Sequence, residues 1–575
     1  MELNQKAGYF SGEHVRNNVH AFLDDHMKRD PKRVVLKWVP MQVLLARAAQ
    51  PSNDPLPHES ITVEGLHERI GHLAAGFQQL GLGKGDRVIL FVPMSMPLYA
   101  SMFALQKIGA IPVFLDSWAR RQHLGASAKI VEPKAMISFE KAFELCDQVP
   151  ELAEIGMKIC VGPTAGLKKY SGHLEQLLQT PGFAEVTPVE QEHTALITFT
   201  TGSSGVPKGA NRTHRFLAAQ HYALDTCIPY TDGDVDLPVF PIFSLNNLAA
   251  GVPTVIPAFD IGTPGDRDPE ILLGQLLSTG TTCTTLSPSL FSRLASFCLA
   301  KNIQLPQLRR VVTGGAPVSR DNVMDFQKIA PKAQIWVLFG STEAEPMAHI
   351  EGHEMVSMKT KASEDPEWVD EGVNVGKMAD GLDFKFLKIQ KGTVEIQSSA
   401  DWKNLEVPQG EVGELIVAGE HVCRNYYNDD EAFKRAKILD ANGVVWHRTG
   451  DLGRLDSYGY LWIVGRVHNA IQRGGRYEFP VRAEMILKKL PFVKLAAYLG
   501  IPDPQLGEKA VCVVTGDDVG NSHSQWKSEI ERIMKKNGVP VDQVVITQSI
   551  PMDPRHHSKV EYEVLKKELT AAQLV

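Results

Sequence analysis

The sequence predicts an α/β protein, with a large N-terminal domain of parallel or mixed sheets covered by helices and a small α+β domain at the C-terminus. Three observations lead to this prediction. Between residues 61 and 116 the apolar pattern alternates between helical and strand spacing. Farther along, buried strand-like runs are followed by glycine turns. The last 110 residues carry short strands and one helix in a different order.

The first α/β unit begins with a helix whose apolar residues share one face: Leu66, Ile70, Leu73, Ala74, Phe77 and Leu80. Turn residues 81–86 end this helix. The chain then alternates strand, helix and strand, which we place at 87–92, 97–108 and 111–115. Such alternation is typical of parallel strands covered by helices.

Strand-like runs continue at 194–200, 308–313, 334–339 and 414–417, and glycine turns follow the middle two. Ligands in open α/β sheets bind outside the carboxyl ends of strands, so these turns are candidate ligand sites. The chain from 363 to 372 is irregular and rich in acidic residues, and we interpret it as a surface loop.

Near the C-terminus we expect short strands at 460–464, 510–514 and 543–546. A helix before the last of these carries Trp526, Ile530, Ile533 and Met534 on one face and ends at Asn537-Gly538. The two domains are predicted to span residues 1–465 and 466–575.

Composition narrows the class of protein. The 575 residues include 60 Lys+Arg and 67 Asp+Glu, a net charge of −7, and 43% are hydrophobic. Such a chain has no overall positive field for nucleic acid, so no nucleic-acid partner is expected. The seven cysteines form no CxxC pair, which favours reduced, buried thiols. No signal peptide or transmembrane segment is recognisable, so we expect a cytoplasmic protein; peripheral contact with a membrane or a pathway enzyme stays open.

The strongest local signal is a glycine loop after the strand at 194–200, Thr200-Thr201-Gly202-Ser203-Ser204-Gly205-Val206-Pro207-Lys208-Gly209. Its glycines permit close backbone approach, and its hydroxyls, backbone N–H groups and Lys208 can surround phosphate oxygens. It is not the GxxxxGK[ST] loop of P-loop phosphotransferases, because its glycines are three residues apart and a proline precedes the lysine. By itself it would also fit a flexible Gly/Ser turn; the preceding strand and the Pro-Lys-Gly ending favour a phosphate loop.

This decapeptide resembles the phosphate loop of the acyl-adenylate-forming superfamily, which includes acyl-CoA synthetases, peptide-synthetase adenylation domains and luciferases. Further motifs of that superfamily follow in order and cover most of the chain: Lys84-Gly85-Asp86-Arg87-Val88, Gly109-Ala110-Ile111-Pro112-Val113, Gly314-Gly315-Ala316-Pro317, Phe339-Gly340-Ser341-Thr342-Glu343, Gly413-Glu414-Leu415, Thr449-Gly450-Asp451, Gly465-Arg466 and Lys559. The resemblance implies an enzyme that joins a carboxylic acid to AMP and releases pyrophosphate.

The resemblance also implies how ATP is held. The β- and γ-phosphates would bind at Thr200, Thr201, Gly202, Ser203, Ser204, Gly205 and Lys208. The adenine would lie against Gly315, Ala316 and Pro317 and stack on Phe339, where the family usually has Tyr, with Gly340 and Ser341 beside it. Asp451 would accept hydrogen bonds from the ribose hydroxyls, and Arg466 would reach the ribose or a phosphate.

Three residues are implied as catalytic. Thr342 would bind the α-phosphate, and Glu343 would be the Mg²⁺ ligand, since Mg²⁺ commonly uses one or two carboxylates with substrate phosphates. Lys559 would bridge the substrate carboxylate and the α-phosphate and stabilise the transition state. It matches the family pattern except that Ser558 stands where a glycine usually precedes the lysine.

Two further positions depart from the family. The hinge about which relatives swing a mobile C-terminal domain usually carries Asp or Lys, and here it is His468. This histidine would either make the rotation respond to pH near neutrality or simply be tolerated as an exposed side chain. The acyl pocket is expected at Phe240, Phe243, Ser244 and Leu245, with Ser244 in place of a common histidine; these residues could equally be core packing.

Three stretches, 236–243, 436–438 and 446–451, together with Arg555-His556 before Lys559, resemble one branch, the olefin β-lactone synthetases. These enzymes adenylate a β-hydroxy fatty acid, whose hydroxyl then displaces AMP. Arg473-Gly474-Gly475 instead matches a segment that lines the pantetheine channel of CoA-using relatives. We therefore expect ATP and Mg²⁺ to act on a medium- or long-chain acid. We expect the acyl group to pass to a CoA thiol, with the substrate's own hydroxyl or a carrier-protein thiol as the alternative acceptor. A catalytically silent nucleotide-binding regulator is the alternative of another class.

Overall fold

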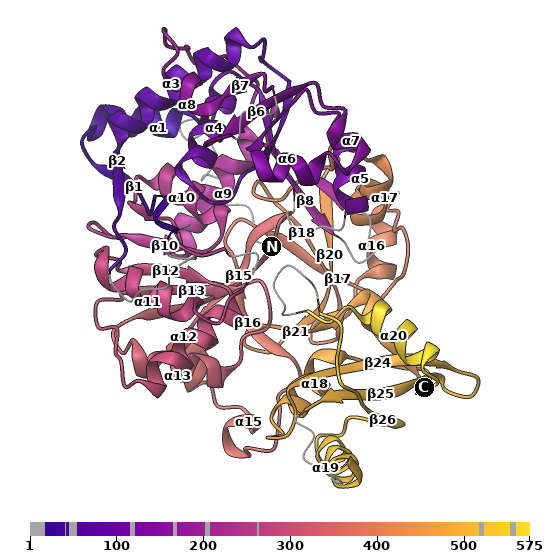
Figure 1. Cartoon of the computed structure of the whole chain (residues 1–575). Helices are drawn as coiled ribbons and strands as arrows, with labels where there is room; N and C mark the ends of the chain where they lie inside the picture. The colour runs from indigo at the N-terminus through magenta and orange to yellow at the C-terminus, as the bar shows by residue number, and fades with distance from the viewer. Residues whose placement is uncertain are drawn as a thin grey trace.

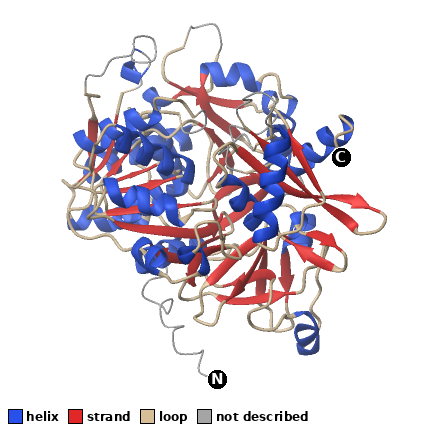
Figure 2. Ribbon diagram, turned by 90° about the horizontal axis from the view of Figure 1, so that it is seen from below, coloured by secondary structure: helices blue, strands red, loops and turns tan. Residues whose placement is uncertain are grey.

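The structure is a computed structural model that describes residues 18–40, 42–44, 46, 55–115, 121–164, 169–201, 207–260, 264–516, 523–552 and 559–575. Within these ranges the strands form three sheets, and helices flank the strands on both sides (Figures 1 and 2). The large N-terminal α/β domain and the small C-terminal domain predicted from the sequence are confirmed.

The first sheet has the order β7-β6-β5-β3-β4-β8-β9. Its neighbours are parallel except for the hairpin of β8 and β9. Its strands are β3 (Arg87–Phe91), β4 (Ile111–Phe114), β5 (Ala135–Phe139), β6 (Met157–Val161), β7 (Gly172–His173), β8 (Thr194–Thr201) and β9 (Pro207–Thr213). The helices among them are α3 (Val63–Gln79), α4 (Met96–Lys107), α5 (Arg121–Val131), α6 (Glu140–Cys146), α7 (Pro150–Ala153) and α8 (Leu174–Leu177).

The predicted alternation in this unit is confirmed, and local capping explains the helix starts. Thr62 accepts a hydrogen bond from the backbone N–H of Gly65 ahead of α3, and Ser95 accepts one from Leu98 ahead of α4. The apolar stripe of α3 is buried, with Leu66, Ile70 and Leu73 among its members.

The second sheet joins a parallel part to an antiparallel part. The strands β1 (Val34–Trp38), β2 (Glu59–Thr62), β10 (Asp236–Pro238), β11 (Thr254–Val255), β12 (Cys283–Leu286), β13 (Arg310–Gly314) and β14 (Gln334–Ser341) are parallel apart from β2. From β14 onward the neighbours are antiparallel: β15 (Ala344–Glu351), β16 (Val373–Met378), β17 (Asp383–Leu387), β18 (Gly413–Ala418), β19 (Lys437–Leu439), β20 (Val445–Leu455) and β21 (Leu461–Arg466). The switch from parallel to antiparallel pairing falls at the β14–β15 turn.

Helices accompany the strands of the second sheet because each parallel strand needs a crossover to reach the next. They are α1 (Ala21–Arg29), α9 (His214–Cys227), α10 (Pro241–Ala250), α11 (Asp268–Ser278), α12 (Pro288–Ala300), α13 (Arg320–Ile329), α14 (Gly352–Ser357), α15 (Lys361–Glu364), α16 (Ser399–Leu405) and α17 (Asp430–Ala436). No described helix has the length and apolar character needed to cross a lipid bilayer. All seven cysteines are buried and free, as predicted.

The third sheet belongs to the C-terminal domain, at the lower right of Figure 1. It contains β22 (Ile471–Arg473), β23 (Arg476–Glu478), β24 (Leu495–Asp503), β25 (Gly507–Thr515) and β26 (Gln543–Ile546), with helices α18 (Pro480–Lys488), α19 (His523–Lys536) and α20 (Tyr562–Ala571). The predicted strand at 460–464 does not belong here. It is β21, which pairs with β16 and β20 in the second sheet because its apolar residues complete that core.

The segment 365–371, expected as a surface loop, instead docks on the C-terminal domain. Val369 is 2% exposed and packs in the core beneath α18 and α19. The Asn537 side chain accepts from the backbone N–H of Val369 at 2.9 Å and donates to the carbonyl of Glu367 at 2.9 Å. Val369 and the hydrogen bonds of the backbone around it therefore tie this segment to Asn537, 168 positions later in the chain.

Candidate active site

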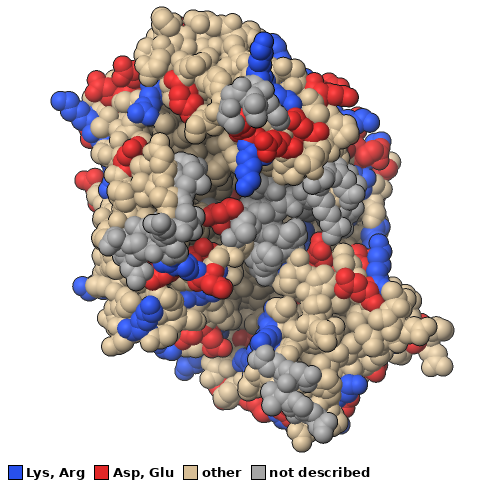
Figure 3. Space-filling view, viewed as in Figure 1, with Lys and Arg blue, Asp and Glu red and all other residues tan. Residues whose placement is uncertain are grey.

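A cavity of ≈ 3430 Å³ is lined by residues from all three sheets. On the face shown in Figure 3 the surface is hollowed near its centre, with acidic and basic side chains interspersed around it. The cavity collects the predicted residues Thr200, Lys208, Phe240, Phe243, Leu245, Gly315, Ala316, Pro317, Phe339, Gly340, Ser341, Thr342, Glu343, Asp451, Arg466, His468 and Lys559. The folded chain thus brings together motifs that are spread over 360 positions of the sequence.

The glycine loop joins the two strands of the β8–β9 hairpin. Thr200 pairs with Lys208 across this hairpin, and Thr201 pairs with Pro207 at its end. The predicted phosphate-binding residues Gly202, Ser203, Ser204 and Gly205 lie outside the described residues. The Lys208 ammonium lies 5.7 Å from the centre of the Tyr426 ring, and burial lowers its pKa although Glu343 nearby opposes the shift. A cation therefore flanks the base of the loop.

The second glycine turn follows β13, at the carboxyl end of a parallel strand. Gly314 leaves no room for a side chain, because a Cβ there would lie 2.1 Å from the carbonyl oxygen of Leu338 on β14. Gly315 has φ +88° and turns the chain into the cavity. Phe339 on β14 faces the same space, so the residues proposed to contact adenine share one wall.

The β14–β15 turn presents Thr342 and Glu343. The Ser341 hydroxyl accepts hydrogen bonds from the backbone N–H groups of Glu343 (3.3 Å) and Ala344 (3.2 Å), so it shapes this turn. The guanidinium of buried Arg212 donates to the Thr342 carbonyl at 2.8 Å and holds the turn from below.

Glu343 is an ionised carboxylate in a mostly buried setting. The Tyr426 hydroxyl donates to its Oε1 at 2.9 Å. Burial by itself would raise the pKa of Glu343, but the nearby His447 ring, the Lys437 ammonium and the tyrosine hydrogen bond together outweigh burial and lower it. Lys437 is only 2% exposed and donates to the Cys423 carbonyl. One carboxylate at the cavity wall, held ionised, fits the way Mg²⁺ binds through few protein ligands and substrate phosphates.

Asp451 and Arg466 are paired across β20 and β21. The Arg466 Nε lies 3.6 Å from Asp451 Oδ1, and its Nη2 donates to the Thr449 carbonyl at 2.9 Å. The Asp451 side chain is 15% exposed and that of Arg466 is 44% exposed, so the arginine is free to turn toward a ligand. Behind them, buried Glu414 and Arg448 form a bidentate pair that holds β18 to β20.

Helix α10 supplies the predicted acyl pocket. Phe240, just before the helix, and Phe243 line the cavity with their ring centres 6.2 Å apart, and Leu245 lines it as well. The prediction for Ser244 is wrong: the side chain is fully buried on the opposite side of the helix, where it interacts with the buried Tyr99 hydroxyl. A step of one residue along a helix turns the side chain by roughly 100°, which explains the difference.

A buried polar network anchors α10. The sequence did not predict it. The Asn247 amide and the Tyr230 hydroxyl both donate to Oδ2 of fully buried Asp236, at 2.9 and 2.7 Å. Asp236 lies on β10, so the network fixes the helix against the strand that precedes it. The only sequence signal was two polar residues inside an otherwise apolar segment.

The C-terminal domain contributes Lys559 and His468 to the cavity wall. Lys559 is exposed there, whereas residues 553–558 before it lie outside the described residues. His468 belongs to a single 3₁₀ turn, Val467–Asn469, between the two domains. Burial, together with the charges of Arg466 and Lys566, lowers the pKa of His468 to about 4. The expectation of titration near neutrality is therefore wrong for this conformation.

Several site residues were missed because their partners are distant in the sequence. Tyr426, Lys437 and His447 surround Glu343, and Glu345 lines the cavity two residues after it. Lys437 and His447 pair directly across β19 and β20. The sequence signal that could have identified them was a titratable residue at an inward position on each of two adjacent strands.

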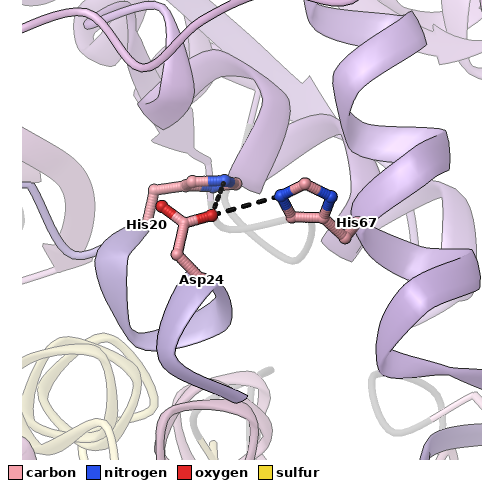
Figure 4. A group of neighbouring side chains, drawn as sticks. All are labelled: His20, Asp24 and His67. Carbon is pink, nitrogen blue, oxygen red and sulfur yellow. Dashed lines mark hydrogen bonds and ion pairs between the residues drawn. The ribbon is translucent and has the colours of Figure 1, made fainter. Parts of the chain in front are cut away.

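A second group of titratable side chains lies away from the cavity. Asp24 on α1 faces both His20 and, on α3, His67, whose Nε2 is 3.2 Å from Oδ1 of Asp24 (Figure 4). Within the described residues it is the group of three His, Cys or acidic side chains that could hold a metal. The Lys107 ammonium lies 3.5 Å from Nε2 of His20, however, so a cation is already supplied by the chain and the group fits an internal ion network.

Comparison with known proteins places the chain among enzymes that adenylate acids. Residues 23–427 match the family described as AMP-binding enzyme. An olefin β-lactone synthetase of Stenotrophomonas maltophilia is 30% identical over 517 residues, which cover 87% of this chain and 89% of that protein. The olefin β-lactone synthetase of Xanthomonas campestris is 29% identical over 521 residues, with the same coverage. A putative acyl-CoA ligase, YdaB of Bacillus subtilis, is 29% identical over 455 residues, 78% of this chain and 83% of that one.

Solved structures share the fold. ATP-bound MatB from Rhodopseudomonas palustris aligns with a TM-score of 0.74 at 20% identity, over 96% of this chain and 99% of its own. The amide bond synthetase McbA from Marinactinospora thermotolerans aligns with a TM-score of 0.73 at 20% identity and the same coverage.

Proposed function

This chain belongs to the AMP-binding enzyme family, and from that membership we propose that it adenylates a β-hydroxy fatty acid and closes the adenylate to a β-lactone. That it is an AMP-forming acid ligase follows from the family and its relatives. The observation that supports the finer proposal is the similarity, over 87% of the chain, to two olefin β-lactone synthetases.

In the first half-reaction, a carboxylate oxygen of the acid attacks the α-phosphate of ATP and pyrophosphate leaves. Lys208 and the glycine loop hold the leaving phosphates, while Phe339 and the turn at Gly315 hold the adenine. Asp451 accepts the ribose hydroxyls, and Arg466 reaches the ribose or a phosphate. Held at Glu343, Mg²⁺ would neutralise charge on the phosphates.

Lys559 completes this step from the C-terminal domain. Its ammonium bridges the acid's carboxylate and the α-phosphate, where negative charge gathers as the new bond forms. We assign the two domains to residues 1–465 and 466–575 and place the hinge at His468. Support comes from the sheet topology, because β21 ends at Arg466 and β22 begins a separate sheet.

In the second half-reaction, the β-hydroxyl oxygen attacks the acyl carbonyl and AMP leaves. Because nucleophile and electrophile belong to one molecule, rotation about the bonds between them brings the hydroxyl oxygen to the carbonyl carbon, and the hydroxyl proton is released as the ring closes. Phe240, Phe243 and Leu245 line apolar space suited to a fatty chain.

Transfer to a CoA thiol is the second candidate, favoured by a specific feature. Arg473, Gly474 and Gly475 form the turn of the β22–β23 hairpin, and both glycines have positive φ. This segment is similar to the one that lines the pantetheine channel in CoA-using enzymes. Acyl-CoA ligases also stand among the relatives.

Both candidates are tested by incubating the enzyme with ATP, Mg²⁺ and a panel of fatty and β-hydroxy fatty acids, with and without CoA, and identifying the products by mass. We expect a β-lactone and AMP from β-hydroxy acids without any thiol. A CoA thioester as the main product would show that the enzyme is an acyl-CoA ligase and not a β-lactone synthetase. The absence of pyrophosphate release with every acid would contradict adenylation and leave a nucleotide-binding regulator.

A further inference from the structure

The chain is anchored to the C-terminal domain immediately after Lys559. Val560 pairs with Met552 in an antiparallel bridge, and the next backbone N–H donates to the Pro551 carbonyl at 2.9 Å. Helix α20 then begins at Tyr562. The backbone that carries the lysine therefore continues directly into a held stretch of chain.

Tyr562, three residues after Lys559, connects this stretch to the rest of the domain. Its hydroxyl donates a hydrogen bond to Oε1 of Glu484 on α18. The same oxygen accepts the backbone N–H of Tyr498 on β24 at 3.2 Å. Glu484 thus joins α18, β24 and α20 at one atom. Glu484, Tyr562 and Lys559 all line the cavity, so this contact belongs to the cavity wall.

Helix α18 also packs on the large domain. Val481 and Met485 lie against a buried cluster of that domain that includes Leu461, and Phe339 packs against the same cluster from the cavity wall. Positions 481, 484 and 485 are three and four residues apart and so share one side of the helix. The helix therefore holds Glu484 at a set position relative to the wall that is proposed to contact adenine.

The role proposed for Lys559 makes strict demands on the position of its backbone. A lysine ammonium sits at the end of a flexible four-carbon stem, so the backbone decides which points it can reach. In the adenylation step the ammonium must meet the acid's carboxylate and the α-phosphate together. A misplacement of about 1 Å at a reacting centre can cost roughly 100-fold in rate.

We propose that Glu484 and Tyr562 are positioning residues for adenylation, whose hydrogen bond holds the backbone after Lys559 so that the ammonium reaches the forming bond between carboxylate and phosphate. This inference rests on the role proposed for Lys559. Glu484 acts through Tyr562, and Tyr562 acts through the three residues that separate it from the lysine.

The first test is Tyr562→Phe, which keeps the ring and removes only the hydroxyl. Single turnovers with ATP, Mg²⁺ and racemic β-hydroxyhexadecanoic acid give the rate of pyrophosphate release over a range of ATP concentrations. We expect the maximal rate to fall about tenfold, the scale of one lost hydrogen bond. The ATP concentration that gives half of this rate should change less than about twofold, because the pair acts on the transition state and not on nucleotide binding.

Variants of Glu484 separate positioning from general stability. Glu484→Gln keeps an oxygen that can accept from the Tyr562 hydroxyl and the Tyr498 N–H, so its maximal rate should stay within about threefold of the wild-type rate. Glu484→Ala removes the acceptor, and its rate should fall about tenfold or more. Adding Tyr562→Phe to Glu484→Ala should then cost little more, because both changes remove the same contact.

Tyr460→Phe is the matched control. The Tyr460 hydroxyl donates to Glu354 in the large domain, and neither residue is among those that line the cavity. The variant therefore makes the same chemical change to a Tyr–Glu pair away from Lys559, and it should release pyrophosphate at the wild-type rate.

A maximal rate in Tyr562→Phe within twofold of the wild-type rate would overturn the proposal. So would a loss that appears mainly as weaker use of ATP, or a Glu484→Gln variant as slow as Glu484→Ala. Lys559→Ala tests the role on which the inference rests. Near-normal pyrophosphate release by Lys559→Ala would show that the role of Lys559 is wrong, whereas its loss there with an unaffected Tyr562→Phe would show that only the positioning role is wrong.

Discussion

Glu343 shows how strongly the chemistry of a side chain depends on residues that are remote in the sequence. The pKa of its carboxyl group is lowered by the Tyr426 hydroxyl from one segment and by Lys437 and His447 from two strands that follow. Two residues later, burial raises the pKa of Glu345, and Arg212 opposes the rise. Residue type and spacing alone do not distinguish these two glutamates.

At this scale we predict that Lys437→Met impairs adenylation most at low pH. Removing the buried ammonium leaves burial to dominate, so the pKa of Glu343 rises and the residue is protonated as the pH falls. The rate of pyrophosphate release at pH 6 should drop about tenfold, a loss of about 1.4 kcal/mol in transition-state stabilisation, while the rate at pH 8 changes less. The pH-rate profile measures this.

Lys434→Met is the matched control, because Lys434 is exposed and pairs with Glu431 on the surface of α17. If the acid limb of the pH-rate profile lies at the same pH in Lys437→Met as in the wild-type protein, the role of Lys437 in lowering the pKa of Glu343 would be contradicted.

The network in Figure 4 supports a second residue-level prediction, on stability. Asp24→Asn removes the negative charge that faces His20, His67 and the buried Lys107. We expect the free energy of unfolding to fall by about 2 kcal/mol, the usual cost of leaving a buried charged group poorly satisfied. Urea unfolding at pH 7 measures it. Glu68→Gln, an exposed neighbour of His67 on α3, should change the stability little, and equal stability of the two variants would be the contrary result.

The same network makes stability depend on pH. Burial and Lys107 lower the pKa of His20 to about 3, below its ordinary value of 6.5. The unfolded chain therefore binds a proton at a pH where the folded one does not, and His20 reduces stability progressively as the pH falls from 6.5 toward 3.

At the scale of elements, the site depends on how closely β13 and β14 approach where they end. Gly314 is the contact point, since a Cβ there would overlap the Leu338 carbonyl. Both turns that face the cavity, at Gly315 and at Thr342, continue from these two strands. The spacing of the strands therefore sets the distance between the residues proposed for adenine and for phosphate.

We predict that Gly314→Ala destabilises the protein by about 1–3 kcal/mol, the usual cost of overpacking, and raises the KM for ATP. Thermal unfolding and steady-state pyrophosphate release measure the two effects. Gly83→Ala is the control, because Gly83 has open space around it and an ordinary φ. A KM for ATP that is unchanged in Gly314→Ala would show that the strand separation does not govern nucleotide binding.

At the scale of the whole molecule, the two domains are joined by more than the hinge. Segment 365–371 of the large domain places Val369 in the core of the small one. The Glu367 carboxylate pairs with Arg532 at 2.7 Å and Lys536 at 2.6 Å. Any rotation of the C-terminal domain must carry this segment along or release it.

Asn537→Ala is expected to weaken the contact between segment 365–371 and the C-terminal domain. The variant loses the hydrogen bonds to the Val369 N–H and the Glu367 carbonyl and leaves a buried backbone donor without its partner. Segment 365–371 should then exchange its amide hydrogens about tenfold faster, since one lost hydrogen bond costs roughly 1.4 kcal/mol. Asn442→Ala, in an exposed turn far from this contact, is the control, and equal exchange in the two variants would contradict the interpretation.

Much of the fold could be predicted from the local spacing of apolar residues in the sequence. The alternation of apolar stripes and strands located β3, α4 and β4 to within one residue at each end, and it identified the buried stripe of α3. These elements have a buried face that shows in the sequence, and capping residues start both helices. The strand at 460–464 was assigned to the wrong sheet, since a short apolar strand does not reveal its pairing partner. Ser244 was misplaced for a similar reason: a motif position does not say which side of a helix faces the cavity.

The sequence by itself determined the superfamily, the order of the motifs and the set of residues proposed to face the nucleotide, because these depend on short runs such as Phe339-Gly340-Ser341-Thr342-Glu343. Only the tertiary structure decided that Lys437, His447 and Tyr426 surround Glu343, that Glu345 lines the cavity, and that Val369 joins the C-terminal core. Charge interactions and burial act through space over a few ångströms, whereas the residues involved are separated by up to about 170 positions in the chain, and folding alone brings them into contact.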